Sequence, residues 1–462
     1  MDNKAICPVF TNLLNSMQRP VLLMMACAVW LARPDAARAQ AVPRRTLSLT
    51  EALSTAIRQS KALKTNTAEQ GVTLARLQQA RNNYAPAISV NASYIRISDN
   101  IQPFSVSLPG AGDVVLNPQI LDQSYNNLQV RQLLWGGGKV RYGIQAAERE
   151  VQAAQIDATA LRLTAADNVT TIWYTLYTLN ASEQIIRQNI NLLQDRRKDL
   201  ENLERQGLVL KNDALKVGLA IANLEGNLID IQSGRAINNF NLAMALGEPA
   251  ETDYVIDSTA LTAGPALEPL GTYLAEAGQS RPEIKALTLR REAALIGQKI
   301  VQSNRLPTLG WGGSYDYNRP NQRVFPNKPE FTGTWNVGVF LSFSLSDQFA
   351  NRAKETETRY TLEKISTGID QLRDGIQMDV NAQYQSYRQA LDRIRVAENA
   401  IGQAGENFRV EQNRLNASTT TPTDFLDANT QLLQARLNLQ SAKANAELAR
   451  WKLLKSVGRI EQ

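Results

Sequence analysis

The stretch WNVGVFLSFSL, residues 335–345, alternates large apolar residues with residues that are mostly small or polar. The large apolar set fills every second position: Trp335, Val337, Val339, Leu341, Phe343 and Leu345. This period of two predicts a β-strand with one apolar face rather than a helix. Such a strand fits a soluble sheet or a membrane barrel, in which the apolar face meets lipid. Its length of about ten residues is that of a tilted strand that crosses a membrane.

The N-terminal region has the order of a secretory signal peptide. Residues 20–32, PVLLMMACAVWLA, form an apolar segment, with Lys4 and Arg19 before it and the sequence ARA at residues 37–39 after it. The segment is too short for a membrane-spanning helix, and its flanks match a charged region and a small-residue cleavage site. We therefore expect residues 1–39 to be a signal peptide that is cleaved at its end.

Cysteine and histidine usage limits the chemistry of the chain. The two cysteines, Cys7 and Cys27, lie inside the predicted signal, and the sequence contains no histidine. A mature chain without them lacks thiolate nucleophiles, disulfides, histidine bases and the usual zinc ligands, so we expect no cofactor, no metal site and no histidine-dependent catalysis. A lipoprotein signal at Cys27 remains an alternative, although the preceding MMA is a poor lipobox. The net charge of +6 is too mild to indicate nucleic-acid binding.

Residues 140–206 contain no proline and a single glycine, and their apolar residues recur every seven positions. The series is Ile144, Val151, Ala158, Ala165, Ile172, Leu179, Ile186, Leu193 and Leu200. This period predicts one supercoiled helix of about 100 Å, at 1.5 Å per residue. Several short helices are the alternative, but no breaker marks a joint between them. A turn at 207–212 is expected next, with a second helix that starts at Asp213 and ends near Gly247.

The same plan occurs twice along the chain. Pro86 and Pro307 are equivalent at a distance of 221 residues, whereas Gly247 and Gly458 are equivalent at 211. The difference arises between the two predicted strands of each repeat, so the first inter-strand loop, at 99–122, is ten residues longer than the second.

We divide the chain into four segments on this basis: the signal at 1–39, the first repeat at 40–247, a linker at 248–270 and the second repeat at 271–462. Each repeat contributes two strands, expected near 87–97, 124–134, 308–317 and 333–345. A shorter helix is expected at 67–82, before the first strand, and the second long helix at 351–415. The sequence TPTD at 421–424 is a capping-box pattern that starts the last helix.

Four strands cannot close a barrel, and open strand edges are not tolerated in lipid. The chains must therefore associate if these strands cross a membrane. Closed membrane barrels have at least about eight strands, and three chains in cyclic symmetry would give twelve.

The order of these features resembles the TolC-like outer-membrane efflux proteins, also called outer-membrane factors. The resemblance rests on both repeats and on LLWGGGKVR at 133–141, QGLVLKND at 206–213 and TDFLDANTQL at 423–432. It implies a mostly α fold with a membrane β-barrel, in which long helices form a periplasmic tunnel and a homotrimer supplies a 12-stranded barrel.

The resemblance also implies a function. The protein would be the channel-tunnel of a tripartite efflux or type I secretion system in the outer membrane of a Gram-negative bacterium. It would be a passive duct, not an enzyme, that docks to a periplasmic adaptor (membrane fusion) protein and an inner-membrane pump of the RND, ABC or MFS type. The cargo and the particular pump stay open.

A periplasmic aperture lined by acidic residues is part of the resemblance. Asp424 and Asp427 match this motif, and their spacing of three puts them on one helix face. Mutual repulsion in a trimer is expected to raise their pKa values. The paired positions in the first repeat are Asp213 and Lys216. As an alternative, Asp424 is only a charge that offsets the helix dipole, and both roles are compatible.

Other positions depart from the family pattern or match it only weakly. Leu415 and Thr420 stand where some relatives carry the Tyr and Arg that lock the closed aperture, so those contacts are not expected here. Gly207 and Leu208 match a tip motif that relatives use to meet the adaptor, and Ser418 replaces the glycine in the second repeat. A plain turn is the alternative at both tips.

The aromatic residues Trp135, Trp311, Tyr315 and Trp335 are predicted to form a lipid-facing interfacial girdle rather than a ligand cage. The neighbouring GGGK sequence at 136–139 does not fit a phosphate-binding loop, because Val140 follows the lysine where Ser or Thr is required. We expect a strand-to-helix turn there.

Two other classes of function remain as alternatives: a structural or adhesive coiled-coil protein, and an enzyme that works with paired carboxylates. The repeated strand pairs favour the conduit, because a coiled-coil spacer needs no membrane strands and an enzyme needs no near-identical halves.

Overall fold

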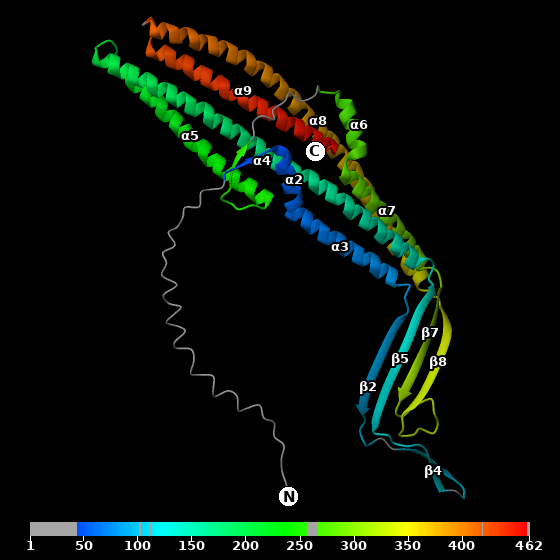
Figure 1. The fold of residues 1–462 in the computed structure, drawn as a ribbon. Coiled ribbons are helices and arrows are strands. Elements are labelled where there is room, and N and C mark those ends of the chain that lie inside the picture. Colours follow the sequence, from blue (N-terminus) through cyan, green and yellow to red (C-terminus); the bar gives the residue numbers. More distant parts are fainter. Residues whose placement is uncertain (1–43, 101–102, 111, 257–266, 418, 460–462) are drawn as a thin grey trace, which may run out of the picture.

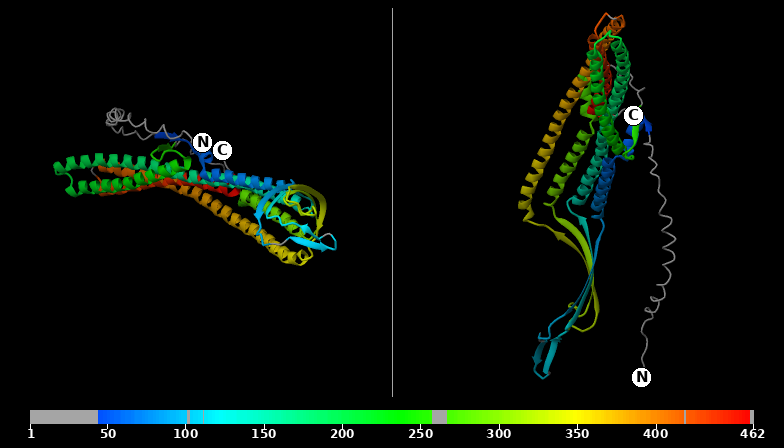
Figure 2. Two further views of the ribbon diagram at one scale, coloured as in Figure 1. Left: turned by 90° about the horizontal axis from the view of Figure 1, so that it is seen from below. Right: turned by 90° about the vertical axis from the view of Figure 1, so that its left-hand side faces the viewer.

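The computed structural model describes residues 44–100, 103–110, 112–256, 267–417 and 419–459. The predicted signal at 1–39 with Cys27, part of the linker and Ser418 lie outside the described residues. Within them the chain is elongated, with long helices toward one end and a four-stranded sheet at the other (Figures 1 and 2).

The fold is mostly helical, as predicted, with two helices far longer than the others. The helices are α2 (Leu49–Gln59), α3 (Lys61–Asn82), α4 (Lys139–Arg205), α5 (Lys211–Leu246), α6 (Leu270–Ser280), α7 (Pro282–Ser303), α8 (Asp347–Asn416) and α9 (Pro422–Val457). The 67 residues of α4 form one unbroken helix, so the alternative of several short helices is wrong. None of the nine predicted seam positions of α4 is exposed, because the seven-residue period keeps one stripe against its neighbours.

The long helices form two hairpins, α4 with α5 and α8 with α9. Helix α4 is central, because it also packs against α3, α7 and α9. Its middle carries the largest buried side chain, Trp173, which is 1% exposed and stacks on Tyr177. The indole N–H donates to the Leu47 carbonyl at 3.3 Å, which ties the N-terminal strand to the middle of the bundle.

Three helix starts differ from the predictions, and one of them is α8, which begins at Asp347 rather than at 351. Helix α3 begins at Lys61 rather than at 67, because the Ser60 hydroxyl accepts a hydrogen bond from the Leu63 N–H and caps it. Helix α5 begins at Lys211, two residues before Asp213. The end of α5 agrees with the prediction, since Gly247 takes the left-handed conformation with φ of 70° and ends the helix.

The strands are β1 (Arg44–Leu47), β2 (Ala87–Arg96), β3 (Phe104–Leu108), β4 (Gly112–Asn117), β5 (Asp122–Trp135), β6 (Asp253–Ile256), β7 (Thr308–Asn318) and β8 (Thr332–Ser342). The main sheet is antiparallel in the order β2-β5-β7-β8. Its four strands are those that the sequence predicts.

The register of this sheet separates an apolar face from a polar face. One transverse row holds Val90, Leu128, Tyr315 and Trp335, and the next row in register on the same face includes Ile88, Val130 and Val337. On the opposite face, a row holds Asn91, Asn127, Asp316 and Thr334. Asn127 Nδ2 donates to Asp316 Oδ1 at 2.6 Å, so the polar face is hydrogen-bonded from strand to strand. The predicted phase of the strands is therefore confirmed.

Four details of the strands were not predicted. Strand β8 ends at Ser342, so Phe343 and Leu345 lie beyond it. A bulge between Leu133 and Trp135 breaks the alternation of β5 and places Trp135 opposite Leu309. The expected loop at 99–122 contains the β3–β4 hairpin, and β1 and β6 form a parallel pair near the middle of the molecule.

Candidate functional site

The tips of the two hairpins lie together at the end of the molecule farthest from the sheet (Figure 1). A groove of about 800 Å³ lies between them, lined by residues of both hairpins that include Leu200, Leu210, Asp213 and Phe425. The ring of Phe425 is 1% exposed and lies 5.5 Å from that of Phe408. Leu415 packs against the same apolar cluster, so it has a packing role here.

The capping box predicted at the start of α9 is present. The Thr421 hydroxyl accepts from the Asp424 N–H at 3.2 Å, and Asp424 Oδ2 accepts from the Thr421 N–H at 3.4 Å and from its hydroxyl at 2.7 Å. These donors hold the pKa of the exposed Asp424 carboxyl below its ordinary value. The expected rise of this pKa is therefore absent in the single chain, where the cap stabilises the charged form.

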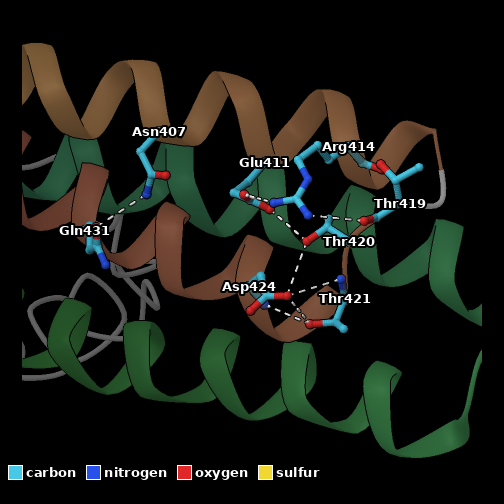
Figure 3. Close-up of polar contacts among 8 residues, drawn as sticks. All are labelled: Asn407, Glu411, Arg414, Thr419, Thr420, Thr421, Asp424 and Gln431. Carbon is cyan, nitrogen blue, oxygen red and sulfur yellow. Dashed lines mark hydrogen bonds and ion pairs between the residues drawn. The ribbon is translucent and has the colours of Figure 1, made fainter.

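Thr420 links the end of α8 to the start of α9. Its hydroxyl donates to Glu411 Oε2 at 2.8 Å and lies 3.3 Å from Asp424 Oδ2 (Figure 3). Glu411 in turn pairs with Arg414 Nη1 at 2.7 Å, and Arg414 reaches the Thr419 carbonyl at 3.4 Å. The tip of the α8–α9 hairpin, here called the second tip, is thus held by contacts within that hairpin. The sequence pattern did not predict these contacts.

A further contact joins the two tips. Lys216 Nζ on α5 donates to Thr423 Oγ1 at 2.8 Å, one residue before Asp424. Of the four predicted aperture residues, the structure therefore brings Lys216 to the start of α9. Asp213 lines the groove between the tips, and Asp427 lies exposed on the first turns of α9.

The first tip is a glycine-terminated turn. Gly207 has φ of 72°, a conformation that favours glycine, and the Leu208 N–H donates to the Leu203 carbonyl at 3.0 Å. Leu208 is 67% exposed and Leu210 is 72% exposed. The tip therefore presents two leucines, of which only Leu208 was predicted.

The predicted girdle residues occupy two levels of the apolar face. Tyr315 and Trp335 are direct partners toward the far end of the sheet, and Trp335 is 73% exposed. Trp311 lies four residues along β7 from Tyr315, about 13 Å nearer the helices. Trp135 lies opposite Leu309, six residues along, about 20 Å nearer. Trp311 is half-buried, and its indole N–H donates to Gln132 Oε1 at 3.1 Å.

The GGGK sequence is a strand-to-helix turn, as predicted. Gly137 has φ of 62°, and an added Cβ would lie 2.8 Å from the Leu306 side chain and 3.2 Å from the Ser303 carbonyl. The Ser303 hydroxyl donates to the Gly137 carbonyl at 2.9 Å. This turn therefore packs tightly on the end of α7.

No group of acidic residues suited to a metal ion occurs among the residues described. None of the described helices is long and apolar enough to cross a membrane.

Residues 273–459 match the family model described as outer membrane efflux protein. A comparison with curated protein sequences gives no significant match. Solved structures similar to the chain include the outer membrane protein VceC from Vibrio cholerae, which is 19% identical with a TM-score of 0.71 over 89% of this chain and 96% of that one.

Two further solved structures are similar to the same extent. The Campylobacter jejuni CmeC outer membrane channel is 13% identical, with a TM-score of 0.72 over 89% of this chain and 85% of that one. The open state of the Neisseria gonorrhoeae MtrE outer membrane channel is 16% identical, with a TM-score of 0.68 over 89% and 88%. The predicted resemblance is thus confirmed: residues 273–459 match the outer membrane efflux protein family model, and the fold over nearly the whole chain is that of solved outer-membrane channels.

Proposed function

We propose that three copies of this chain form the outer-membrane channel-tunnel of a tripartite efflux or type I secretion system. The observation that carries the proposal is the arrangement of free edges. Strands β2 and β8 are the two outer strands of the main sheet, and neither has a further partner among the described residues. Unpaired backbone groups are not tolerated in lipid, so this sheet needs further strands on both sides.

The sheet closes in a simple way if β8 of one copy pairs with β2 of the next. Strands alternate in direction along the order β2-β5-β7-β8, so that pairing is again antiparallel. Three copies then give twelve strands, enough for a barrel with an open lumen. The apolar face would meet lipid, and the row that includes Asn127 and Asp316 would line the lumen.

The helices that adjoin the two outer strands also expose apolar side chains. Helix α3 leads directly into β2, and β8 leads directly into α8. Helix α8 carries exposed apolar residues at spacings close to whole turns of about 3.6 residues: Phe349, Tyr360, Met378, Val396 and Val410. Helix α5, at the other edge, also exposes an apolar set: Leu215, Leu219, Ile229, Ile237, Phe240 and Met244. One ring of three chains would bury both sets.

The partners follow from the family. The helical tunnel would stand in the periplasm of a Gram-negative bacterium, and the tips at Gly207 and Leu208 and at Ser418 would meet a periplasmic adaptor. An inner-membrane pump of the RND, ABC or MFS type would supply the energy. Asp424 and Asp427, with Asp213 and Lys216 near them, would line the aperture through which cargo enters.

The proposal is tested with protein extracted from outer membranes in detergent. We expect a trimer-sized band in unheated electrophoresis that falls to the monomer on heating, and stepwise conductance in planar lipid bilayers. A coiled-coil spacer or a carboxylate enzyme would be found in the soluble fraction and would not conduct.

A further inference from the structure

The segment after β7 turns back onto the polar face of the sheet. We call residues 320–324, PNQRV, the inner loop. Before it, β7 is extended by a backbone bridge in which Arg319 and Ser124 each donate to the other at 2.8 Å. Gln322 Nε2 then lies 3.3 Å from the hydroxyl of Tyr125, whose position in β5 belongs to the polar face. The chain therefore leaves β7 and crosses over this face instead of continuing outward.

A buried amide holds the inner loop in place. Asn321 is 3% exposed, although it lies in a connection between two strands. Its Nδ2 donates to the Thr332 carbonyl at 2.8 Å and to Thr334 Oγ1 at 3.1 Å, while its Oδ1 accepts from the Arg323 N–H at 3.0 Å. A buried amide with all of these partners makes a stable anchor, since leaving them unpaired is costly.

Arg323 fastens the loop to the middle of the same face. Its Nη1 lies 3.4 Å from Asp316 Oδ2, and Asp316 is only 15% exposed in its side chain. With the Asn336 amide oriented so that its oxygen faces Arg323, this oxygen accepts from the same guanidinium at 2.8 and 3.1 Å. Asp316 and Asn336 belong to adjacent transverse rows of the polar face. Three separate contacts thus direct the inner loop to one side of the sheet.

The corresponding connection in the first repeat behaves differently. Strands β3 and β4 form a hairpin that extends beyond the ends of the main sheet, whereas the connection after β7 stays beside it (Figure 1). The shorter of the two connections is therefore the one that turns inward.

We propose that the inner loop narrows the outer mouth of the channel and sets the largest molecule that can cross this mouth. This inference rests on the proposed function, because the polar face becomes a lumen only in a closed barrel. Three inner loops then project into the mouth of one trimer. Arg323 is a positioning residue, which holds the loop inward through Asp316 and Asn336.

The test compares two basic residues of the same connection. Arg323→Ala removes the attachment to the sheet. Lys328→Ala is the matched control, because Lys328 pairs at 3.7 Å with Glu330, and both side chains are at least 60% exposed. Purified channels in planar bilayers are probed with neutral polyethylene glycols of graded size, added on the side of the outer mouth. We expect Arg323→Ala to admit larger polymers and to conduct more current, and Lys328→Ala to keep the wild-type size limit.

A cross-link supplies the complementary arm. The sequence contains no cysteine after Cys27, so Asp316→Cys with Arg323→Cys introduces a unique pair within the described chain. A short bis-methanethiosulfonate, which forms one disulfide with each cysteine and releases two methanesulfinates, is expected to restore the wild-type size limit. A thiol reductant, which reduces both disulfides, is expected to release the loop. Conducting channels in which Arg323→Ala keeps the wild-type size limit would overturn the inner-loop proposal alone. A wild-type protein that forms no channel would overturn the proposed function with it.

Discussion

Asn189 on α4 and Asn429 on α9 donate to each other through their side-chain amides, at 2.9 and 3.1 Å. The two residues are 8% and 2% exposed, and neighbouring side chains such as Ile186 and Leu433 belong to one apolar cluster. Because α4 and α9 belong to different hairpins, this self-complementary pair fixes the axial register of one hairpin against the other. Buried Asn pairs have the same effect in coiled coils, at a cost in stability.

The first prediction concerns this pair. Asn189→Leu leaves the Asn429 amide buried without a partner, which costs about 1–3 kcal/mol, whereas Asn189→Leu with Asn429→Leu removes both polar groups and recovers most of that loss. Thermal unfolding of the purified protein, followed by circular dichroism, measures both. A double variant that is less stable than Asn189→Leu would show that the amides do not act as a pair.

The apolar face of the sheet supplies a second prediction. Val337→Arg places a charge on the face expected to meet lipid, at a cost of roughly 2–4 kcal/mol per copy near the bilayer centre. Gly338→Arg is the matched control one residue along, where an added Cβ meets nothing within 4 Å and the side chain belongs to the opposite face. We expect only Val337→Arg to prevent assembly in the outer membrane, measured as heat-modifiable trimer. Equal losses would mean that the faces are assigned wrongly.

The exposed apolar residues of α8 supply a third prediction. Val396 is 65% exposed in the single chain, and Val396→Glu would place a carboxylate in the proposed contact between copies. Glu398→Lys changes an exposed position about 200° around the same helix. We expect the first change to weaken the trimer in detergent and the second to leave it intact, as measured by size-exclusion chromatography with light scattering. A trimer indifferent to Val396→Glu would exclude this edge from the contact.

The charge at the second tip gives a prediction on pH. Since the Thr421 donors lower the pKa of Asp424, the stabilisation by its charged cap is fully present above the unfolded value of about 4 and is lost as the pH falls through the lower folded value. If Asp424 and Asp427 line the aperture, the channel prefers cations. We expect that preference to persist at pH 5, and Thr421→Val to shift its loss to higher pH.

Reversal potentials in planar bilayers measure this preference. Asp424→Ala with Asp427→Ala should lower it and weaken block by multivalent cations from the periplasmic side, without dissociating the trimer. A wild-type preference that disappears between pH 6 and pH 5 would mean that repulsion among the copies outweighs the cap. Unchanged selectivity in the double variant would place the constriction elsewhere.

The sequence predicted those elements whose own periodicity specifies them. Helix α4 differs from its predicted bounds by one residue at each end, because the apolar residues from Ile144 to Leu200 repeat without interruption. The start of α3 was not predicted, because the first turn after the Ser60 cap lacks a regular repeat of apolar residues. Strands β1 and β6 escaped notice because each has four residues and they pair across about two hundred positions.

The candidate site divides in the same way. The TPTD sequence predicted the cap of Asp424, because both partners are three residues apart. The contacts of Glu411 with Thr420 and of Lys216 with Thr423 join different helices, and no spacing along the chain encodes them. The role of Arg323 could not be predicted either. Its partner Asp316 lies in a strand and Arg323 in a connection, so no periodic pattern relates the two residues.

The central claim is that three chains close into one ring through the edge formed by β2 and α3 and the edge formed by β8 and α8. Native mass spectrometry of the protein extracted from the outer membrane tests it most directly. The account predicts a complex with the mass of three processed chains, which dissociates when Val337→Arg is introduced. A monomer in the soluble periplasmic fraction, or a ring with another number of chains, would contradict it.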